Sequence, residues 1–291
     1  MRISESLRGN GPHFSFEFFP PKSDEGVEAL IETTRRLRAL RPAFVSVTYG
    51  AGGSNRARTI AVATRIKREL EMEVLAHVTC VGHSAAELRT VFTELAAGGI
   101  ENVLALRGDP PKGQPPFIPA DGGFRYAVEL LDLLSSEFAF CTGAAVYPEV
   151  HPEAVDAASD LENALRKVEA GAEFLITQMF FDNDYYFAFV ERARAAGVRV
   201  PIIPGIMPIT GFSQVAHMTA MIGATIPARL LHELEARKDE PEAVAELGVA
   251  YATLQSADLL ARGAPGIHFY TLNRSPATRA VVSALLAGSK T

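Results

Sequence analysis

One carboxylate, Glu17, stands in an apolar stretch near the N-terminus, between Phe16 and Phe18. In an extended strand, residues 14, 16 and 18 face one side and residues 15, 17 and 19 face the other. Phenylalanines stand on both sides, so we expect both sides to be covered and Glu17 to be removed from water. A carboxyl group out of water keeps its proton more readily and can donate it to a substrate near neutral pH. The alternative is a structural Glu paired with Arg or Lys.

Three further positions carry groups suited to a large polar ligand. Arg107, Gly108 and Asp109 place a cation, a flexible joint and an anion in succession, although a turn with an internal salt bridge is the alternative. Gln178 can donate and accept hydrogen bonds, which suits the edge of a pterin or nicotinamide ring, unless its neighbours satisfy it. His77 stands in another apolar run, where a histidine is either a functional group or a hydrogen-bonded structural residue.

A fourth group of polar residues has helical spacing. Asp160, Asn163, Arg166 and Lys167 are three and four residues apart, which places them on one face of a helix. Such a face could bind a pyrophosphate and a sugar. A solvated ionic face is the alternative.

The chain lacks the motifs of several other chemistries. It has no His-Glu-x-x-His motif and no cysteine cluster, so we expect no catalytic metal. It has no Gly-x-Ser-x-Gly elbow and no P-loop, which argues against a serine nucleophile and against phosphoryl transfer from ATP. The polar residues suit instead a cofactor with redox chemistry of its own.

The elements that must position these residues alternate along the chain. Eight β-type runs separated by helical patterns predict an α/β protein, a (β/α)8 TIM barrel with eight parallel strands. An open doubly wound sheet is the competitor, but Pro20-Pro21-Lys22 rather than a glycine fingerprint follows the first run. The predicted strands are residues 14–19, 44–49, 74–79, 102–106, 140–147, 174–178, 200–206 and 266–271. The predicted helices cover roughly residues 25–40, 55–71, 84–98, 124–137, 153–170, 184–196, 212–262 and 276–287.

The long connection 212–262 should add two or three helices between strands seven and eight of a single catalytic domain, 1–291. Active sites of such barrels lie at the carboxyl ends of the strands, where Glu17 and the other polar residues are expected to meet.

Composition limits the partners and the compartment. The net charge is −6 without a basic block, so we expect no nucleic acid. No stretch reaches the length of a membrane span and no signal-peptide core begins the chain, so we expect a cytoplasmic protein without a membrane partner. Cys80 and Cys141 fit reduced thiols rather than a disulfide framework.

Six stretches together resemble one family, the 5,10-methylenetetrahydrofolate reductases, and in particular its short bacterial type. They follow the family's order, and each falls at the end of a predicted strand. The matching stretches are residues 14–22, 44–54, 106–111, 147–153, 176–181 and 268–274.

The resemblance implies a barrel that holds FAD and reduces 5,10-methylenetetrahydrofolate to 5-methyltetrahydrofolate with NAD(P)H, which supplies methyl groups for methionine synthesis. Hydride would pass from NAD(P)H to the flavin and then to the folate, which predicts ping-pong kinetics. Glu17 would protonate N10 of the substrate, Asp109 would hydrogen-bond the pterin, and Gln178 would contact nicotinamide or pterin. The cofactor residues implied by the resemblance are Thr48, Tyr49, Ala51, His77, Arg107, Gly108, Asp109, Tyr126, Ala127, Tyr147, His151, Asp160, Asn163, Arg166 and Lys167.

The resemblance also bears on the substrate tail and on assembly. Gln214 and Arg274 fall where the family holds the folate tail, whose carboxylates suit a cationic Arg. Met218 lies near a position where relatives can carry an aromatic residue that stacks on the substrate. Relatives form dimers or tetramers, so we expect a homo-oligomer, and the end of the chain at Thr291 leads us to expect no regulatory domain.

Three alternatives stay open at this point. The chain could be another flavin barrel oxidoreductase, such as one acting on proline. It could be a folate-binding barrel that transfers methyl groups to a corrinoid protein without redox chemistry, although this gives no reason for the face at residues 160–167. It could also be a non-catalytic partner subunit, against which Glu17, Asp109 and Gln178 argue.

Overall fold

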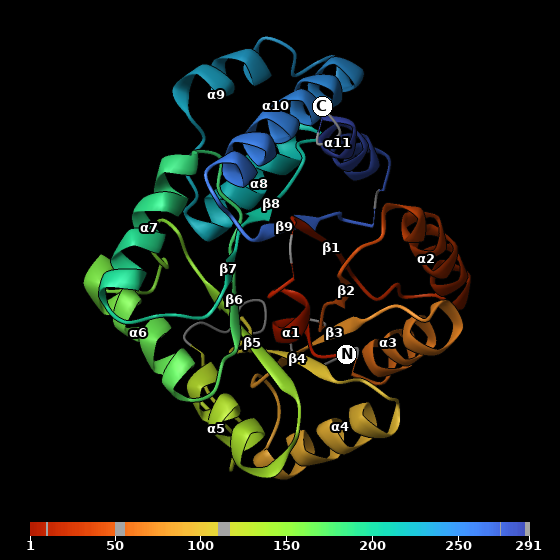
Figure 1. Ribbon diagram of the computed structural model, residues 1–291, viewed down its shortest axis with the longest axis vertical. Helices are drawn as coiled ribbons and strands as arrows, with labels where there is room; N and C mark the ends of the chain where they lie inside the picture. The colour runs from red at the N-terminus through yellow and green to blue at the C-terminus, as the bar shows by residue number, and fades with distance from the viewer. Residues whose placement is uncertain (10, 50–55, 110–116, 274, 289–291) are drawn as a thin grey trace.

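Parallel strands curve around a central axis, and helices cover the outside of the curve (Figure 1). The computed structural model describes residues 1–9, 11–49, 56–109, 117–273 and 275–288, without the side chain of residue 275. The sheet order is β7-β6-β5-β4-β3-β2-β1-β9-β8, with every neighbouring pair parallel. The strands are β1 His13–Phe18, β2 Phe44–Val47, β3 Val74–Thr79, β4 Asn102–Leu106, β5 Cys141–Val146, β6 Phe174–Thr177, β7 Ile202–Ile203, β8 Gly205–Ile206 and β9 Gly266–Tyr270.

The predicted seventh strand is divided at Pro204. β7 pairs with β6 on one side, whereas β8 pairs with β9 on the other. A proline has no backbone N–H and interrupts a ladder, but its carbonyl group can still accept: Pro204 O accepts from His268 N at 2.9 Å. The two pieces together fill the place between β6 and β9, so the predicted (β/α)8 barrel is confirmed.

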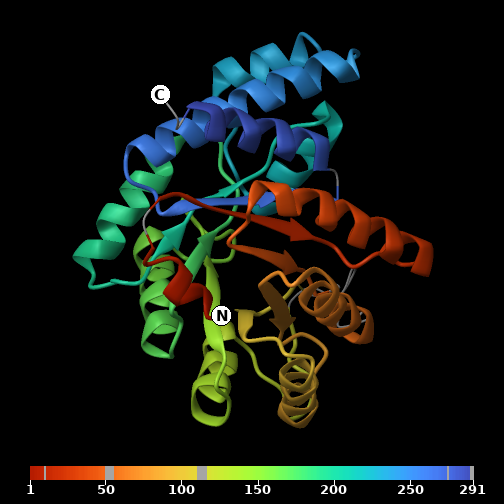
Figure 2. The ribbon, with the colours of Figure 1, turned by 45° about the vertical axis from the view of Figure 1, so that its right-hand side comes forward.

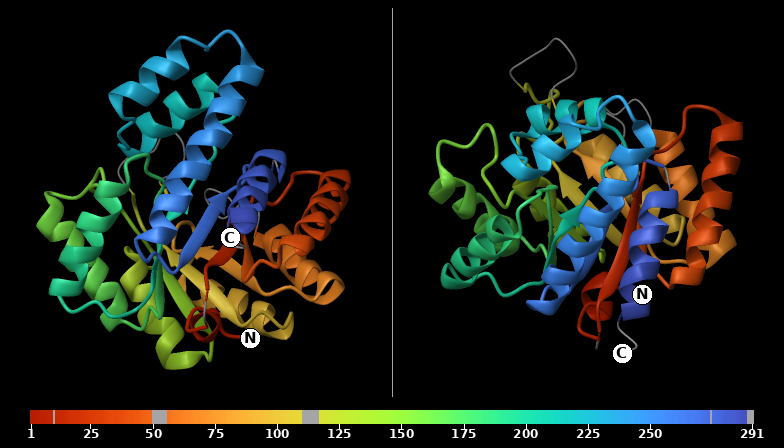
Figure 3. Two further views of the ribbon diagram at one scale, coloured as in Figure 1. Left: turned by 45° about the horizontal axis from the view of Figure 1, so that its top comes forward. Right: turned by 90° about the horizontal axis from the view of Figure 1, so that it is seen from above.

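Helices follow the strands in the predicted alternation, and three helices occupy the connection between β8 and β9 (Figure 3). Within the described residues, none of the helices has both the length and the apolar character that crossing a membrane would require. The helices are α1 Ile3–Ser6, α2 Asp24–Leu37, the short 3-10 helix η1 Arg38–Leu40, α3 Arg56–Leu70, α4 Ala85–Ala97, α5 Ala127–Glu137, α6 Ala157–Glu169, α7 Asn183–Ala195, α8 Phe212–Ile222, α9 Ala228–Glu235, α10 Pro241–Ala261 and α11 Ser275–Gly288.

Local sequence signals explain where several helices begin. A capping box opens α4, because Ser84 Oγ accepts from Glu87 N while a Glu87 carboxylate oxygen accepts from Ser84 N at 2.8 Å. Asp156 caps α6 in the same way through Ser159 N, and α10 starts with Pro241, where a missing N–H does no harm.

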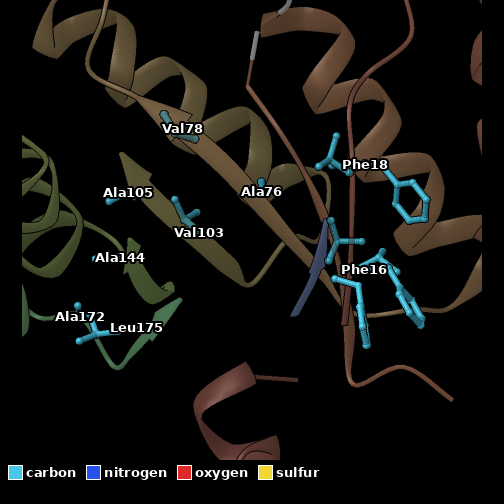
Figure 4. Packing of buried hydrophobic residues seen from close by; sticks show 14 of the residues in the cluster. Phe16, Phe18, Ala76, Val78, Val103, Ala105, Ala144, Ala172 and Leu175 are labelled. Atoms are coloured by element: carbon cyan, nitrogen blue, oxygen red, sulfur yellow. The ribbon is translucent and has the colours of Figure 1, made fainter. Parts of the chain in front are cut away.

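The main core lies between the barrel wall and the surrounding helices. Phe16 and Phe18 of β1 are fully buried there with Val27 and Ile31 of α2, and the outward residues of β3 to β6 continue this layer (Figure 4). The predicted alternation of β1 is therefore confirmed, with the phenylalanines outward and Glu17 inward. Phe19 is an exception to the expected burial, because it follows the end of β1 and stays 42% exposed.

A short N-terminal helix, α1, closes the amino-terminal end of the barrel and was not predicted (Figures 1 and 2). Ile3 and Leu7 are buried against a cluster that includes Phe44 and Phe174. The Asn102 side chain accepts from Ile3 N at 2.8 Å. Because α1 has only four residues, its sequence is too short to show the periodic pattern that predicts a helix.

We expect Ile3→Ala to lower the free energy of unfolding by about 2–4 kcal/mol, because it removes a buried side chain from this end of the barrel. Urea unfolding of the cofactor-free protein measures this loss. Ile118→Ala is the matched control, since Ile118 is 76% exposed and should change stability by less than about 0.5 kcal/mol. Equal effects of the two variants would show that α1 does not seal the barrel.

Candidate functional site

The site is centred on Glu17, which lies inside the barrel near the carboxyl end of β1. Its side chain is buried, as the sequence predicts. Glu17 Oε2 lies 3.6 Å from His77 Nε2 of β3 and 3.5 Å from His268 Nε2 of β9. Among the described residues, the basic side chains at ion-pair distance from Glu17 are these two imidazoles and not Arg or Lys, the partner that the alternative interpretation requires.

His77 is almost entirely buried beside Glu17. Burial lowers the pKa of His77 from 6.5 to about 4, against the opposing effect of the Glu17 charge. The imidazole is therefore neutral at pH 7 and brings no fixed positive charge to the carboxyl group.

Several buried polar atoms in this part of the barrel have no hydrogen-bond partner among the described residues. They include Ser46 Oγ on β2, Thr79 Oγ1 and His77 Nε2 on β3, and His268 Nε2 on β9. Ser46 pairs in register with Glu17, so the two side chains share the inner face. Buried polar atoms in native proteins find partners, and the barrel mouth is therefore suited to a polar ligand.

The end of β4 carries the second predicted feature. Arg107 pairs with Glu153, its Nη2 donating at 2.8 Å, and its guanidinium lies 5.4 Å above the ring of Phe117. The salt bridge within residues 107–109 that the alternative interpretation requires is replaced, among the described residues, by this contact with Glu153. Gly108 has a φ of +81°, and a Cβ there would lie 2.6 Å from a methyl group of Val81, so only glycine fits. Asp109 follows, exposed at the mouth.

Residues of β5 and α6 form a second group beside Arg107. The rings of Tyr147 and His151 meet edge to face at 4.6 Å, and Asp160 Oδ2 accepts from His151 N at 2.9 Å. Lys167 Nζ donates to Ala145 O at 2.8 Å. Burial lowers the pKa of Lys167, while Asp160 opposes the shift.

The predicted polar face of α6 is therefore divided. Asp160 and Lys167 turn toward the barrel, whereas Asn163 and Arg166 are exposed. Arg166 lies 3.5 Å from Glu162 one turn away, as in an ordinary solvated pair.

Other predicted residues lie after β2 and at the start of α5. Tyr49 is hydrogen bonded to His83 Nε2 at 3.1 Å, and Thr48 is half-buried at the end of β2. Tyr126 is 56% exposed, next to the buried Ala127 at the start of α5.

On the opposite side of the mouth, Gln178 Oε1 accepts from Met179 N at 2.9 Å, which leaves its amide N–H groups as donors. Burial raises the pKa of Tyr147, and a hydrogen bond with Gln178 offsets part of the rise. Gln214 Oε1 is 3.2 Å from Thr210 Oγ1, and Met218 is half-buried near Val215 in an apolar cluster. Ala51 and Arg274 lie outside the described residues.

His268 was not predicted as a site residue, although it belongs to the matching stretch 268–274. His268 is fully buried, and its Nδ1 lies 2.8 Å from Ser15 Oγ. Alternation along 266–270 places His268 and Tyr270 on one face, which is the signal that could have found it. Among the described residues, no group of three or more His, Cys, Asp or Glu is arranged to hold a metal ion.

The buried His77 predicts a pH dependence of stability. The unfolded chain takes up a proton near pH 6.5 and the folded protein only near pH 4, so unfolding becomes easier as pH falls through this window. The difference amounts to about 3 kcal/mol at most. In urea unfolding of the cofactor-free protein, His77→Gln should lose less stability between pH 7 and pH 4.5 than the wild type does. His217→Gln, at an exposed position on α8, is the control; a wild-type pH slope in His77→Gln would contradict the neutral state of His77.

Comparison with known proteins adds sequence relatives. The family model described as methylenetetrahydrofolate reductase matches residues 2–286. The 5,10-methylenetetrahydrofolate reductase of Escherichia coli K12 is 40% identical over 273 residues, which cover 93% of this chain and 90% of that protein. Methylenetetrahydrofolate reductase (NADH) 1 of Arabidopsis thaliana is 40% identical over 271 residues, 89% of this chain and 46% of the relative. The chain thus spans about half the length of the plant relatives it matches.

Solved structures share the fold at lower identity. A protein from Clostridium thermocellum, described as binding two copies of 5-methyl-5,6,7,8-tetrahydrofolic acid, superposes with a TM-score of 0.66 at 15% identity and covers 97% of this chain and 96% of its own. Such a likeness shows the fold alone. With a family model matching nearly the whole chain and a bacterial relative of similar length at 40% identity, the chain belongs to the methylenetetrahydrofolate reductase family.

Proposed function

We propose that the protein reduces 5,10-methylenetetrahydrofolate to 5-methyltetrahydrofolate, consuming one NADH and one proton. Family membership supports the reaction, and the names of the plant relatives support NADH as the donor. The observation that carries the proposal is the place of Glu17: an inward, buried carboxyl group with no Arg or Lys beside it among the described residues.

The chemistry gives Glu17 a defined task. The methylene bridge of the substrate is a closed ring and a poor hydride acceptor. A proton from Glu17 to N10 opens this ring to an iminium at N5, whose carbon accepts hydride readily. The barrel wall buries the carboxyl group, and the neutral His77 does not hold it as a permanent ion pair.

The residues at the mouth fit FAD as the cofactor. Arg107 and Lys167 supply cations for a pyrophosphate, while unpartnered His77 Nε2 and Thr79 Oγ1 offer polar contacts to a ring system. Bound FAD would supply transfer of hydride from NADH to the folate in two successive half-reactions, which is the basis of ping-pong kinetics. Glu153 must release Arg107 if a phosphate group is to take its place.

The remaining assignments follow the family and are part of the proposal. Asp109 hydrogen-bonds the pterin, and Gln178 binds pterin or nicotinamide through an amide N–H donor. Gln214 and Arg274 bind the glutamyl tail. We further propose that residues 1–291 form one catalytic domain, and that the protein works in the cytoplasm as a dimer or tetramer.

The visible spectrum tests the function. The purified protein should carry a flavin band that NADH bleaches without oxygen and that methylenetetrahydrofolate restores. A protein that FAD cannot reconstitute would refute the flavin, and a band that the folate does not restore would refute the substrate.

Glu17→Gln tests the acid. This variant should bind FAD and be reduced by NADH as the wild type is, because the amide fills the same space. Reoxidation by methylenetetrahydrofolate should slow by about 10²–10⁴-fold in stopped-flow measurements. Glu173→Gln, at the opposite end of the barrel beside Arg2 and Ser4, is the matched control and should leave both half-reactions unchanged. Loss of FAD from Glu17→Gln would make Glu17 structural instead.

A further inference from the structure

One level below Glu17 inside the barrel, Ser15 of β1 and His268 of β9 are hydrogen bonded to each other. In the ladder between β1 and β9, Ser15 lies opposite His268 and Glu17 lies opposite Tyr270. All four side chains therefore face the barrel interior. Ser15 and His268 are fully buried, so their hydrogen bond at 2.8 Å forms away from water.

The imidazole of His268 is held on three sides. Its Nδ1 meets Ser15 Oγ, its face stacks on Phe44 with ring centroids 5.8 Å apart and planes 19° apart, and Tyr270 meets it at 87° and 5.5 Å. Tyr270 is in turn fixed, because its hydroxyl donates to Thr177 O at 2.7 Å. The ring cannot turn without breaking these contacts, and Nε2 stays directed at Glu17 Oε2, 3.5 Å away.

We propose that His268 is a positioning residue for the proton donor: Ser15 donates to its Nδ1, which places the remaining ring proton on Nε2, the nitrogen that lies 3.5 Å from Glu17 Oε2. This tautomer presents an N–H group to Glu17, which suits the carboxylate that remains after Glu17 has given its proton to the substrate. The effect of His268 on catalysis rests on the proposed function, whereas its contacts with Ser15 and Glu17 do not.

The pair orients Glu17 and does not resupply its proton. Below it lie Phe44, Leu75, Leu104 and Phe174, in the cluster that α1 seals. Among the described residues, apolar side chains dominate this layer, which opposes proton transfer to solvent through it. After each turnover, Glu17 therefore takes its proton from the mouth, and His268 holds the carboxyl group in place while it does.

Two substitutions at position 268 separate orientation from packing. His268→Gln keeps an amide N–H near the place of Nε2, whereas His268→Asn reaches only the place of Nδ1 and loses the contact with Glu17. In stopped-flow measurements on the FAD-loaded protein, His268→Asn should slow reoxidation by methylenetetrahydrofolate about 10- to 100-fold and leave reduction by NADH within about twofold. His268→Gln should recover most of this loss. Ser15→Ala should slow reoxidation by an amount between those of the two variants, because the ring proton can then occupy either nitrogen of His268.

His13→Asn is the matched control, since His13 lies on the same strand, four residues before Glu17, and should leave both half-reactions unchanged. A His268→Asn variant that is slowed equally in both half-reactions, or a His268→Gln variant as slow as His268→Asn, would overturn the proposal in favour of a packing role. Unchanged reoxidation in His268→Asn would overturn it as well.

Nitrogen NMR of the cofactor-free protein, labelled at histidine, tests the contact independently of turnover. The His268 signal, identified by its loss in His268→Gln, should report the tautomer with its proton on Nε2, and Ser15→Ala should shift it toward a tautomer mixture. A proton on Nδ1 would refute the assignment. If this signal is as expected but methylenetetrahydrofolate fails to reoxidise the wild type, the proposed function fails while the Ser15–His268–Glu17 contact stands.

Discussion

The two-residue period of β1 is the constraint on which the site depends. It sends Phe14, Phe16 and Phe18 outward into the layer shared with the helices, and Ser15 and Glu17 inward. A shift of one residue in register would bury the carboxylate among helices and place phenylalanines at the mouth. The outward apolar side chains therefore fix the side of the strand on which the acid lies.

The interior of the barrel is divided along its axis. At the amino-terminal end, apolar residues and α1 exclude water; above them lies the polar level of Ser15, Ser46, His77 and His268. The mouth itself carries charged groups that can meet a ligand, such as Arg107. This change from apolar to charged residues along the axis places the carboxyl group of Glu17 where it is removed from water and still open to substrate from the mouth.

Much of this arrangement could be predicted from the sequence. The strand runs, the alternation around Glu17 and the long connection between the last strands are periodic signals, and the structure agrees with each. The division of strand seven was not predicted, because a proline at 204 is compatible with either a strand end or an interruption, and only the partners on both sides decide between them. Alternation along 266–270 places His268 inside the barrel, but it does not show the contact with β1, which is far away in the chain. The pairing of Arg107 with Glu153 was missed for the same reason, since ion pairs between loops leave no local pattern.

The pairing of β1 with β9 has a consequence for how the protein matures. The hydrogen bond between Ser15 and His268 joins residues 253 positions apart, and the bond between Asn102 and Ile3 joins residues 99 apart. During synthesis β1 can pair with β9 only after nearly the whole chain has been made. Contacts between residues so distant in the sequence form slowly. The surroundings of Glu17 are thus complete only when the last strand docks, so a truncated or half-folded chain holds the acid without the geometry that orients it.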